Sequence, residues 1–408
     1  MERLIVVSKK ACRRYGIIEQ VEARRMTQMK AAEVLGMTDR HFRRLLKAYR
    51  QHGAAGLASK KGGKPSYNRL PDQLKTKVVR IVKKDLEGFG PTLAREKLIE
   101  CYGIKVAVET LRKWMIEAGL WKPRKSKDKR VYQSRNRRNS LGELIQIDGS
   151  PHDWFEGRRD KCCLLGFIDD ATSSVMHLKF VEAETTRDYL KAFQEYVEEH
   201  GRPEGCYSDR HSIFRINAKE DGYIQKGITQ LGRALKELDI ELICANSPQA
   251  KGRIERLFST LQDRLVKELR LRKISTIEEA NKYLPKYIKQ HNKRFAVEAA
   301  QEGNKHRPLE TDTALEEVLC FKTERKLTKN LELSYEGKIL QIETDQPSYG
   351  LRGAQVTVKE QLDGKLIIDY RGRQLKHREL MVKSSQGKIL DRKRVLGRTK
   401  NPQGKRVA

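Results

Sequence analysis

Three acidic residues that lie far apart in the sequence have types and positions suited to chemistry. Asp148 follows the apolar run LIQI, Asp209 follows GCYS, and Glu255 lies in the stretch SPQAKGRIERLFSTLQDRL. Taken singly, each would be an ordinary turn cap or a solvated acid. Clustered together, they would repel one another strongly unless cations bound there. Because carboxylate oxygens suit Mg²⁺ or Mn²⁺, we interpret the three as candidate metal ligands.

The residues around Glu255 predict an amphipathic helix. At about 100° per residue, Glu255 falls at the rim of an apolar stripe, about 100° from its centre. Lys251 and Gln262 fall within about 40° of Glu255. A helix face with an acid, a lysine and a glutamine can hold a metal and contact a DNA backbone. The apolar stripe consists of Ile254, Leu257, Phe258, Leu261 and Leu265.

The elements that would position these acids lie in residues 141–272. GELIQIDGS, KCCLLGFIDDA and SSVMHLKFVEA predict three successive strands, and GCYSD and ELICANS predict two more that alternate with helices. This order is typical of a mixed five-stranded sheet with helices on both faces. The first and fourth strands are then neighbours, so Asp148 and Asp209 can meet. Asp169 and Asp170 end the second strand, and we interpret them as turn acids.

The overall charge favours a polyanionic partner. Lys and Arg number 85 against 54 Asp and Glu, so the formal net charge is +31. Such a surplus is typical of proteins that bind nucleic acid or an anionic membrane surface. No apolar run is long enough for a transmembrane helix, and the first residues lack the pattern of a signal peptide. The seven cysteines show neither disulfide nor zinc spacing, so we expect a reduced, cytoplasmic setting.

Residues 1–58 contain a predicted helix-turn-helix DNA-binding domain. In TQMKAAEVLGMTDRHFRRLLKAYR, Gly36 can adopt a left-handed turn, and Thr38 or Asp39 can cap the second helix. A small helical hairpin with a solvated basic face is the alternative. The turn glycine together with the basic second helix favours DNA binding. The candidate contacts are Arg40, His41, Arg43, Arg44 and Lys47.

The pattern of residues 70–121 predicts a second helical DNA-binding domain, again with two helices joined by a short turn. One helix ends near Tyr102 and another begins near Val108, so that Arg112 and Lys113 face outward. A purely structural helical bundle fits this pattern equally well.

A basic linker, residues 122–140, follows. It cannot pack into a core, and it is either a solvated spacer or a tether along DNA phosphates. Its candidate DNA contacts are Arg124, Lys125, Arg130, Arg137 and Arg138.

The remaining chain divides into three parts by composition. Residues 273–320 are polar with a helical pattern and predict a helical connector. Short alternating runs separated by glycines in residues 321–382 predict a small antiparallel β-barrel. Residues 383–408 form a basic tail that we expect to be disordered. The predicted fold class is therefore a multidomain α/β protein: helix-turn-helix domains, a core with a mixed five-stranded sheet, and a small C-terminal β-barrel.

The segments IDGSPHDWFEGR, YSDRHSIF and NSPQAKGRIERLF resemble the DDE transposases of bacterial insertion sequences. These belong to the retroviral-integrase superfamily, and the GSPHDW segment resembles the ISNCY-like group in particular. The resemblance covers most of the chain. It implies an RNase H-like catalytic core with a catalytic triad at Asp148, Asp209 and Glu255. The chain departs from the common integrase pattern in the longer segment between the second aspartate and the glutamate.

The activity that this resemblance implies is transposition by phosphoryl transfer. Two Mg²⁺ (or Mn²⁺) ions per active site, roughly 4 Å apart, would clamp the scissile phosphate. The enzyme would cleave the transposon ends and join the 3′-hydroxyls to target DNA. Lys251 would contact a phosphate, and Trp154 would either stack at the DNA end or cover the sheet.

The resemblance also implies partners and rival functions. The first helix-turn-helix would read terminal inverted repeats in double-stranded DNA, and pairing two ends requires at least a dimer on DNA. We expect a bacterial cytoplasmic protein associated with the nucleoid, with no membrane partner. A catalytically inactive DNA-binding regulator and an RNase H-like nuclease, which cuts without joining, are the alternatives.

Overall fold

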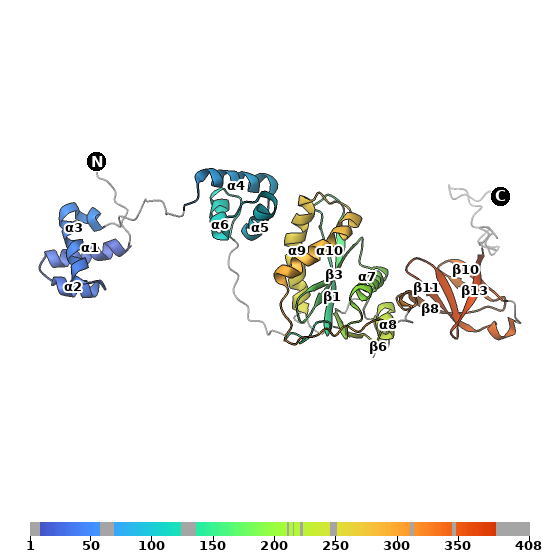
Figure 1. Ribbon diagram of the computed structural model, residues 1–408. Coiled ribbons are helices and arrows are strands. Elements are labelled where there is room, and N and C mark those ends of the chain that lie inside the picture. The colour runs from blue at the N-terminus through green and yellow to red at the C-terminus, as the bar shows by residue number, and fades with distance from the viewer. Residues whose placement is uncertain are drawn as a thin grey trace, which may run out of the picture. The chain divides into compact units, whose positions relative to one another are not determined.

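The computed structural model describes residues 9–57, 69–123, 136–209, 212–214, 216–220, 223–244, 251–310, 314–344 and 348–380. The chain forms two compact units, Met1–Lys122 and Pro123–Ala408, and each is described by itself (Figure 1). Across these described ranges, no helix combines the length and the apolar character needed to cross a membrane.

The predicted helix-turn-helix is present in the first unit. Thr27 and Thr38 begin its two helices, because each side chain accepts a hydrogen bond from a backbone amide of the first turn. Gly36 lies in the turn with φ of 63°, a conformation that favours glycine. The helices are α1 (Lys9–Glu22), α2 (Gln28–Val34) and α3 (Asp39–His52), followed by the 3₁₀ helix η1 (Gly53–Leu57).

Three further helices complete the first unit. The left-handed conformation of Gly103, with φ of 66°, ends the second of them. Trp114 and Met115 are buried, as the apolar stripe predicts. The helices are α4 (Asp72–Asp85), α5 (Pro91–Tyr102) and α6 (Val108–Glu117).

A mixed five-stranded sheet forms the centre of the second unit, in the order β3-β2-β1-β4-β7. β1 and β3 each run antiparallel to β2, whereas β1, β4 and β7 run parallel. This order and these directions define an RNase H-like core, which confirms the predicted sheet. The strands are β1 (Leu144–His152), β2 (Cys162–Asp169), β3 (Val175–Val181), β4 (Gly205–Ser208) and β7 (Glu241–Cys244).

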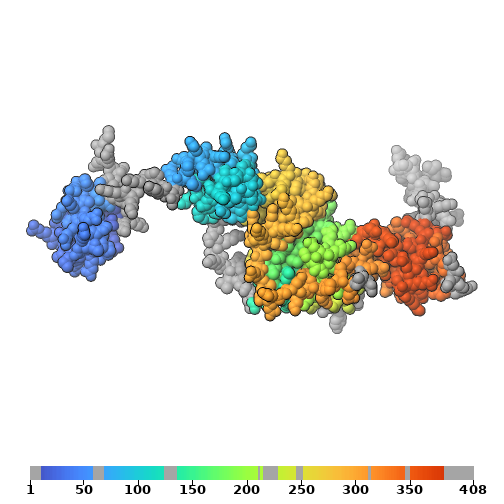
Figure 2. All heavy atoms as spheres, viewed as in Figure 1, coloured from blue at the N-terminus to red at the C-terminus, as the bar shows by residue number. Residues whose placement is uncertain are grey.

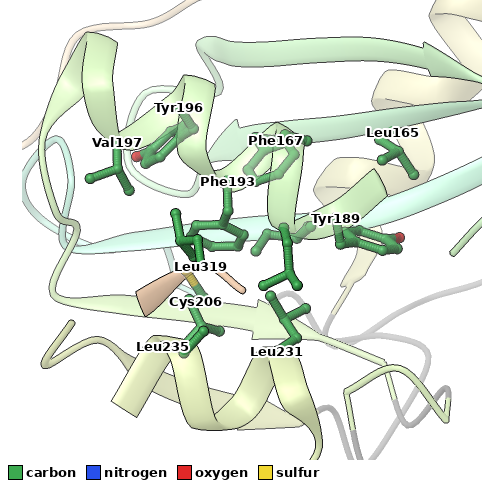
Figure 3. Close-up of a cluster of buried hydrophobic side chains, with 14 of the residues drawn as sticks. Leu165, Phe167, Tyr189, Phe193, Tyr196, Val197, Cys206, Leu231, Leu235 and Leu319 are labelled. Atoms are coloured by element: carbon green, nitrogen blue, oxygen red, sulfur yellow. The ribbon is translucent and has the colours of Figure 1, made fainter. Parts of the chain in front are cut away.

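Helices cover both faces of this sheet. On one face, α7 (Thr186–His200) and α8 (Gln230–Glu237) enclose a core rich in aromatic side chains (Figure 3). There Phe167 of β2 stacks on Tyr196 of α7 with ring centroids 5.5 Å apart. On the other face lie α9 (Gly252–Leu271) and α10 (Ile277–Phe295). Atoms of α9, α10 and the chain after them cover much of the core in the space-filling view (Figure 2).

Two segments of the second unit differ from the sequence prediction. The polar insertion after β4 contains a hairpin, β5 (Ile216–Glu220) and β6 (Tyr223–Gly227). Among the described residues of the predicted helical connector, only α10 and the short α11 (Leu315–Val318) are helical. Residues 296–310 contain no helix. They form bridges with the core instead, Leu141 with Asn304 and Arg202 with Arg307.

The C-terminal part is a nearly closed, barrel-like sheet of six strands in the order β8-β11-β12-β13-β10-β9, as predicted for this region. Four of its strands correspond to the alternating runs of the sequence. The other two, β8 and β13, have mostly exposed or half-buried side chains. The elements are β8 (Phe321–Lys326), β9 (Glu332–Tyr335), β10 (Lys338–Glu343), the 3₁₀ helix η3 (Ser348–Leu351), β11 (Gln355–Glu360), β12 (Leu366–Tyr370) and β13 (Arg373–Leu380).

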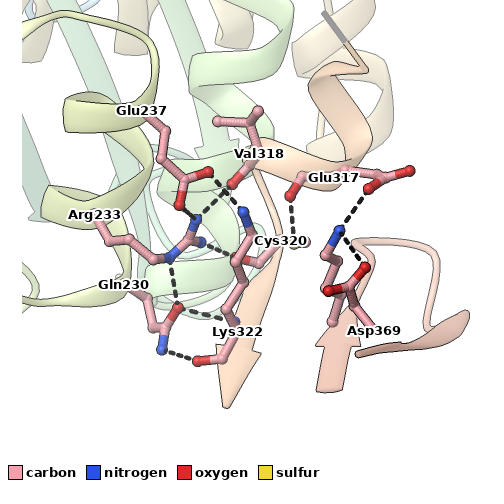
Figure 4. Close-up of polar contacts among 9 residues, drawn as sticks. Gln230, Arg233, Glu237, Glu317, Val318, Cys320, Lys322 and Asp369 are labelled. Atoms are coloured by element: carbon pink, nitrogen blue, oxygen red, sulfur yellow. Dashed lines mark hydrogen bonds and ion pairs between the residues drawn. The ribbon is translucent and has the colours of Figure 1, made fainter. Parts of the chain in front are cut away.

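Polar contacts join α8 of the core to the start of the barrel (Figure 4). The side-chain amide of Gln230 donates to the carbonyl oxygen of Lys322 at 2.7 Å and accepts from its amide at 3.0 Å. Arg233 donates to the carbonyl oxygens of Val318 and Cys320. These contacts anchor the first strand of the barrel to the core. Residues 383–408, the predicted tail, lie outside the described residues.

Candidate active site

The parallel pair β1 and β4 brings Asp148 and Asp209 to the same end of the sheet. Gln146 of β1 is in register with Tyr207 of β4, and each aspartate lies two residues further along the chain, Asp148 within β1 and Asp209 directly after β4. This is the arrangement that the predicted strand order requires.

One buried ammonium group lies between the two carboxylates. The Nζ atom of Lys251 is 2.9 Å from Oδ1 of Asp148 and 3.5 Å from Oδ2 of Asp209. The side chain of Lys251 is only 8% exposed. Burial raises the pKa of Asp148, the hydrogen bond and charge of Lys251 lower it, and the charges of Asp209 and Glu184 raise it further. Two acids from separate strands therefore share one positive charge.

Glu255 occupies the first turn of α9 with an exposed side chain. Within the described part of the chain, no three His, Cys, Asp or Glu side chains are close enough together to hold a metal ion. The pair that the structure brings together is thus Asp148 with Asp209, around Lys251. This pair fits a divalent cation, because its hard oxygen donors already converge on a single cationic group.

A fourth acid, Glu184, lies beside the first aspartate and escaped the sequence analysis. A Cβ atom built on Gly149 would lie 2.8 Å from Oε2 of Glu184, so this carboxylate rests against β1 next to Asp148. The hydroxyl of the buried Tyr189 donates to Oε1 of Glu184 at 2.8 Å. The only sequence signal is its position between β3 and Thr185, the N-cap of α7.

Two predicted DNA contacts near the site have partners within the core. Trp154 is 0% exposed. Its indole nitrogen donates to the carbonyl oxygen of Ser150 at 2.9 Å, and its ring lies edge-on to Phe180. These contacts favour a sheet-covering role over stacking on DNA. The amide of Gln262 donates to the hydroxyl of Ser150 at 3.1 Å.

The acids that end β2 behave as turn acids. Asp169 accepts hydrogen bonds from the amides of Gly142 and Thr172 at 3.0 and 2.7 Å. Asp170 is 0% exposed and accepts from the amide of Arg138 at 2.9 Å.

Two of the predicted DNA contacts in the linker, Arg137 and Arg138, bind to the core. Arg137 donates to the carbonyl oxygen of Ala171 at 3.0 Å and to the hydroxyl of Ser173 at 2.7 Å. Arg138 is held by the bond from its amide to Asp170 and by an ion pair with Glu143 at 3.4 Å. The remaining candidates of this linker, Arg124, Lys125 and Arg130, lie outside the described residues.

The basic candidates of the first unit lie on the surface of helices. On α6, Lys113 is exposed, whereas Arg112 pairs with Glu109 at 2.5 Å and lies over the ring of Trp121. On α3 all five candidates are exposed: Arg40, His41, Arg43, Arg44 and Lys47.

Comparison with known proteins agrees with this arrangement. Residues 10–75 match the family model described as winged helix-turn helix. The chain is 44% identical to y4bF of Sinorhizobium fredii (strain NBRC 101917 / NGR234), a predicted transposase, over 92% of this chain and 82% of that protein. It is 28% identical to the transposase for insertion sequence IS1202 of Streptococcus pneumoniae, over 88% of this chain and 83% of that protein. The chain belongs to the family of insertion-sequence transposases, enzymes that process DNA.

Among solved structures, the chain is similar to retroviral integrases. The HTLV-2 integrase catalytic core domain in complex with magnesium (dimeric form) is 17% identical, with a TM-score of 0.29 over 38% of this chain and 88% of that chain. The simian T-cell lymphotropic virus intasome in complex with PP2A regulatory subunit B56 gamma is 13% identical, with a TM-score of 0.33 over 70% of this chain and 98% of that chain.

Proposed function

We propose that this transposase binds the terminal inverted repeats of an insertion sequence, cleaves the transposon ends and joins the 3′-hydroxyls to target DNA. The observation that supports this reaction best is the convergence of Asp148 and Asp209 on the buried ammonium of Lys251. Two-metal phosphoryl transfer requires carboxylates that converge on cations, and these two aspartates already converge on one cationic group.

Asp148, Asp209 and Glu255 would hold the divalent cations, Mg²⁺ or Mn²⁺, two per active site. Such ions, when bound, neutralise charge on the scissile phosphate and make water or a 3′-hydroxyl a better nucleophile. The protein supplies the negative charge that attracts them and the rigid strands that fix the aspartates. Lys251, released from Asp148, would donate to a phosphate oxygen of the bound DNA.

The basic face of α3 would read the terminal repeats through Arg40, His41, Arg43, Arg44 and Lys47, and α6 would add contacts through Arg112 and Lys113. With a net charge of +31, much of the affinity for DNA should come from counterion release and fall steeply with salt. Because two ends must be paired, the active assembly would be at least a dimer on DNA.

A cleavage and joining assay with labelled transposon-end duplexes and Mg²⁺ tests this function. The wild-type protein should nick the ends and join them to a target plasmid. Asp148→Asn, Asp209→Asn and Glu255→Gln should bind the ends and form no product. Asp263→Asn is the matched control, because Asp263 is an acid of α9 that pairs with Lys267 of its own helix. Cutting without joining would instead identify a nuclease, and binding without cutting a regulator.

A further inference from the structure

A buried glutamine connects the strand that carries Asp148 to the helix that carries Glu255. Gln146 of β1 is 0% exposed. Its side-chain nitrogen donates to Oδ1 of Asp170 at 2.7 Å, and its side-chain oxygen accepts from the backbone amide of Ile254 at 3.2 Å. Both polar atoms of the side-chain amide are thus hydrogen-bonded, the nitrogen to the turn after β2 and the oxygen to the first turn of α9.

The hydrogen bond from the amide of Ile254 to Gln146 caps the N-terminus of α9. The first amides of any α-helix have no partner within the helix, and a side chain at the N-cap usually accepts from one of them. In α9 the N-cap residue is Lys251, and its side chain makes no capping hydrogen bond. Gln146 supplies the acceptor from the neighbouring strand instead. The amide that it binds belongs to the residue directly before Glu255.

A second bond ties the same turn to the same junction. Arg253, the residue before Ile254, donates to Oδ1 of Asp170 at 2.8 Å. Asp170 therefore accepts hydrogen bonds from both Gln146 and Arg253. The side chain of Asp170 is 0% exposed, and that of Arg253 is 15% exposed. Bonds among buried polar groups are costly to break, because the partner left behind stays unsatisfied in a medium of low dielectric constant.

We infer that Gln146 is a positioning residue that sets the first turn of α9, and with it Glu255, at a defined distance from Asp148. The inference rests on the proposed function, in which Asp148 and Glu255 act together. Gln146 lies two residues before Asp148 on the same strand, so both project from the same face of β1. Asparagine would be too short to span the two contacts, and a glutamate would lack the donor that Asp170 requires.

The test compares the loss of two glutamine side chains, one at the proposed positioning site and one elsewhere in the same unit. Gln146→Met keeps the volume and removes both hydrogen bonds. Gln230→Met likewise removes the hydrogen bonds of a glutamine side chain, here those with the backbone of Lys322 and with Arg233 between α8 and the barrel (Figure 4). Hydrogen exchange of the α9 first turn, affinity for end duplexes and the rate of end cleavage are measured for both variants and the wild type.

In Gln146→Met, the amides of the α9 first turn should exchange about three- to tenfold faster in the metal-free protein. The cleavage rate should fall about 10- to 100-fold, as is usual when a group that orients a metal-binding side chain is lost. Affinity for the ends should stay within about twofold, because Gln146 is buried and cannot contact DNA. Gln230→Met should change neither the exchange of this turn nor the cleavage rate.

A shorter amide keeps the inference testable if Gln146→Met does not fold. Gln146→Asn stays polar but cannot reach both Asp170 and the amide of Ile254, so it should show the same faster exchange and the same loss of cleavage. The inference is overturned if folded Gln146→Met or Gln146→Asn exchanges and cleaves like the wild type. Inactivity of the wild type would instead count against the proposed function.

Discussion

The ammonium nitrogen of Lys251 lies 2.9 Å from Oδ1 of Asp148. The lysine precedes α9 and the aspartate lies on β1, so this contact joins the two elements that carry Glu255 and the first metal-ligand candidate. The single ammonium offsets part of the negative charge of Asp148 and Asp209. A divalent cation bound there must displace it, which makes Lys251 both a competitor of the metal and a candidate phosphate contact.

Replacing Lys251 with methionine should therefore have opposite effects on two ligands. Without DNA, the affinity for Mn²⁺ should rise at least about tenfold, because a charged hydrogen bond no longer competes for Asp148. Affinity for transposon ends should fall, because a phosphate contact is lost. Mn²⁺ titration followed by electron paramagnetic resonance and a DNA-binding assay measure the two effects. Lys267→Met, which removes a lysine of α9 paired with Asp263, is the control. Unchanged Mn²⁺ affinity in Lys251→Met would contradict the competition.

Gly149 should be needed to keep Glu184 in place. In Gly149→Ala, the new methyl group would lie 2.8 Å from Oε2 of Glu184, so this flexible carboxylate must move and release Tyr189. The free energy of unfolding should drop by about 1 kcal/mol, close to the effect of Tyr189→Phe. Chemical denaturation of the single and double variants measures this. Full additivity of the two substitutions would mean that they do not act on the same hydrogen bond.

The exposed basic face of α3 should provide the specific affinity for transposon ends. Arg44→Ala should weaken binding of the end duplex, by about 1–3 kcal/mol if this arginine reads a guanine. If it contacts only a phosphate, binding should weaken equally on all sequences and the salt dependence should become shallower. Arg50→Ala is the control on the same helix, because Arg50 pairs with Glu22 at 2.9 Å. Unchanged end binding after substitution of all five basic residues of this face would contradict the assignment.

The stability of the core should decrease in mild acid because His306 is neutral in the fold. Burial and the charge of His200 lower the pKa of His306 from 6.5 to about 4. Its Nδ1 faces an acceptor, Oδ1 of Asn304, so Nδ1 carries the proton and Nε2 accepts from the hydroxyl of Tyr196. Below pH 6.5 this histidine becomes protonated in the unfolded chain but stays neutral in the folded chain. The free energy of unfolding is therefore highest above pH 6.5 and decreases as the pH falls toward about 4.

Denaturation curves between these pH values test the histidine. His306→Gln should flatten the decline without abolishing it, because burial also lowers the pKa of His291 to about 4. His52→Gln, at an exposed position of α3, should leave the pH dependence unchanged. If His306→Gln declines as steeply as the wild type, the ring is not held neutral by these contacts.

Much of the fold could be predicted because its signals are local. Threonine caps and a turn glycine define α2 and α3, and the serial order of the strands determines that β1 and β4 are neighbours. The pairing of Asp148 with Asp209 follows from that order.

The features that escaped prediction depend on contacts between distant segments. Gln146 lies inside the apolar run LIQI, and its role follows only from the approach of α9. In the sequence Glu184 is one acid among several before a helix, and only the structure shows that its carboxylate lies against Gly149 of β1. The strands β8 and β13 lack a clear alternation of buried side chains, because they pair in the barrel while keeping most side chains exposed or half-buried.

Anomalous scattering from Mn²⁺ tests the central claim most directly, in crystals of the protein bound to transposon-end DNA. The account predicts anomalous peaks with oxygen atoms of Asp148, Asp209 and Glu255 at about 2.1 Å, next to a DNA phosphate, and with Lys251 withdrawn from Asp148. Peaks bound elsewhere, or a Glu255 carboxylate that stays out of reach of the aspartates in the DNA complex, would contradict it.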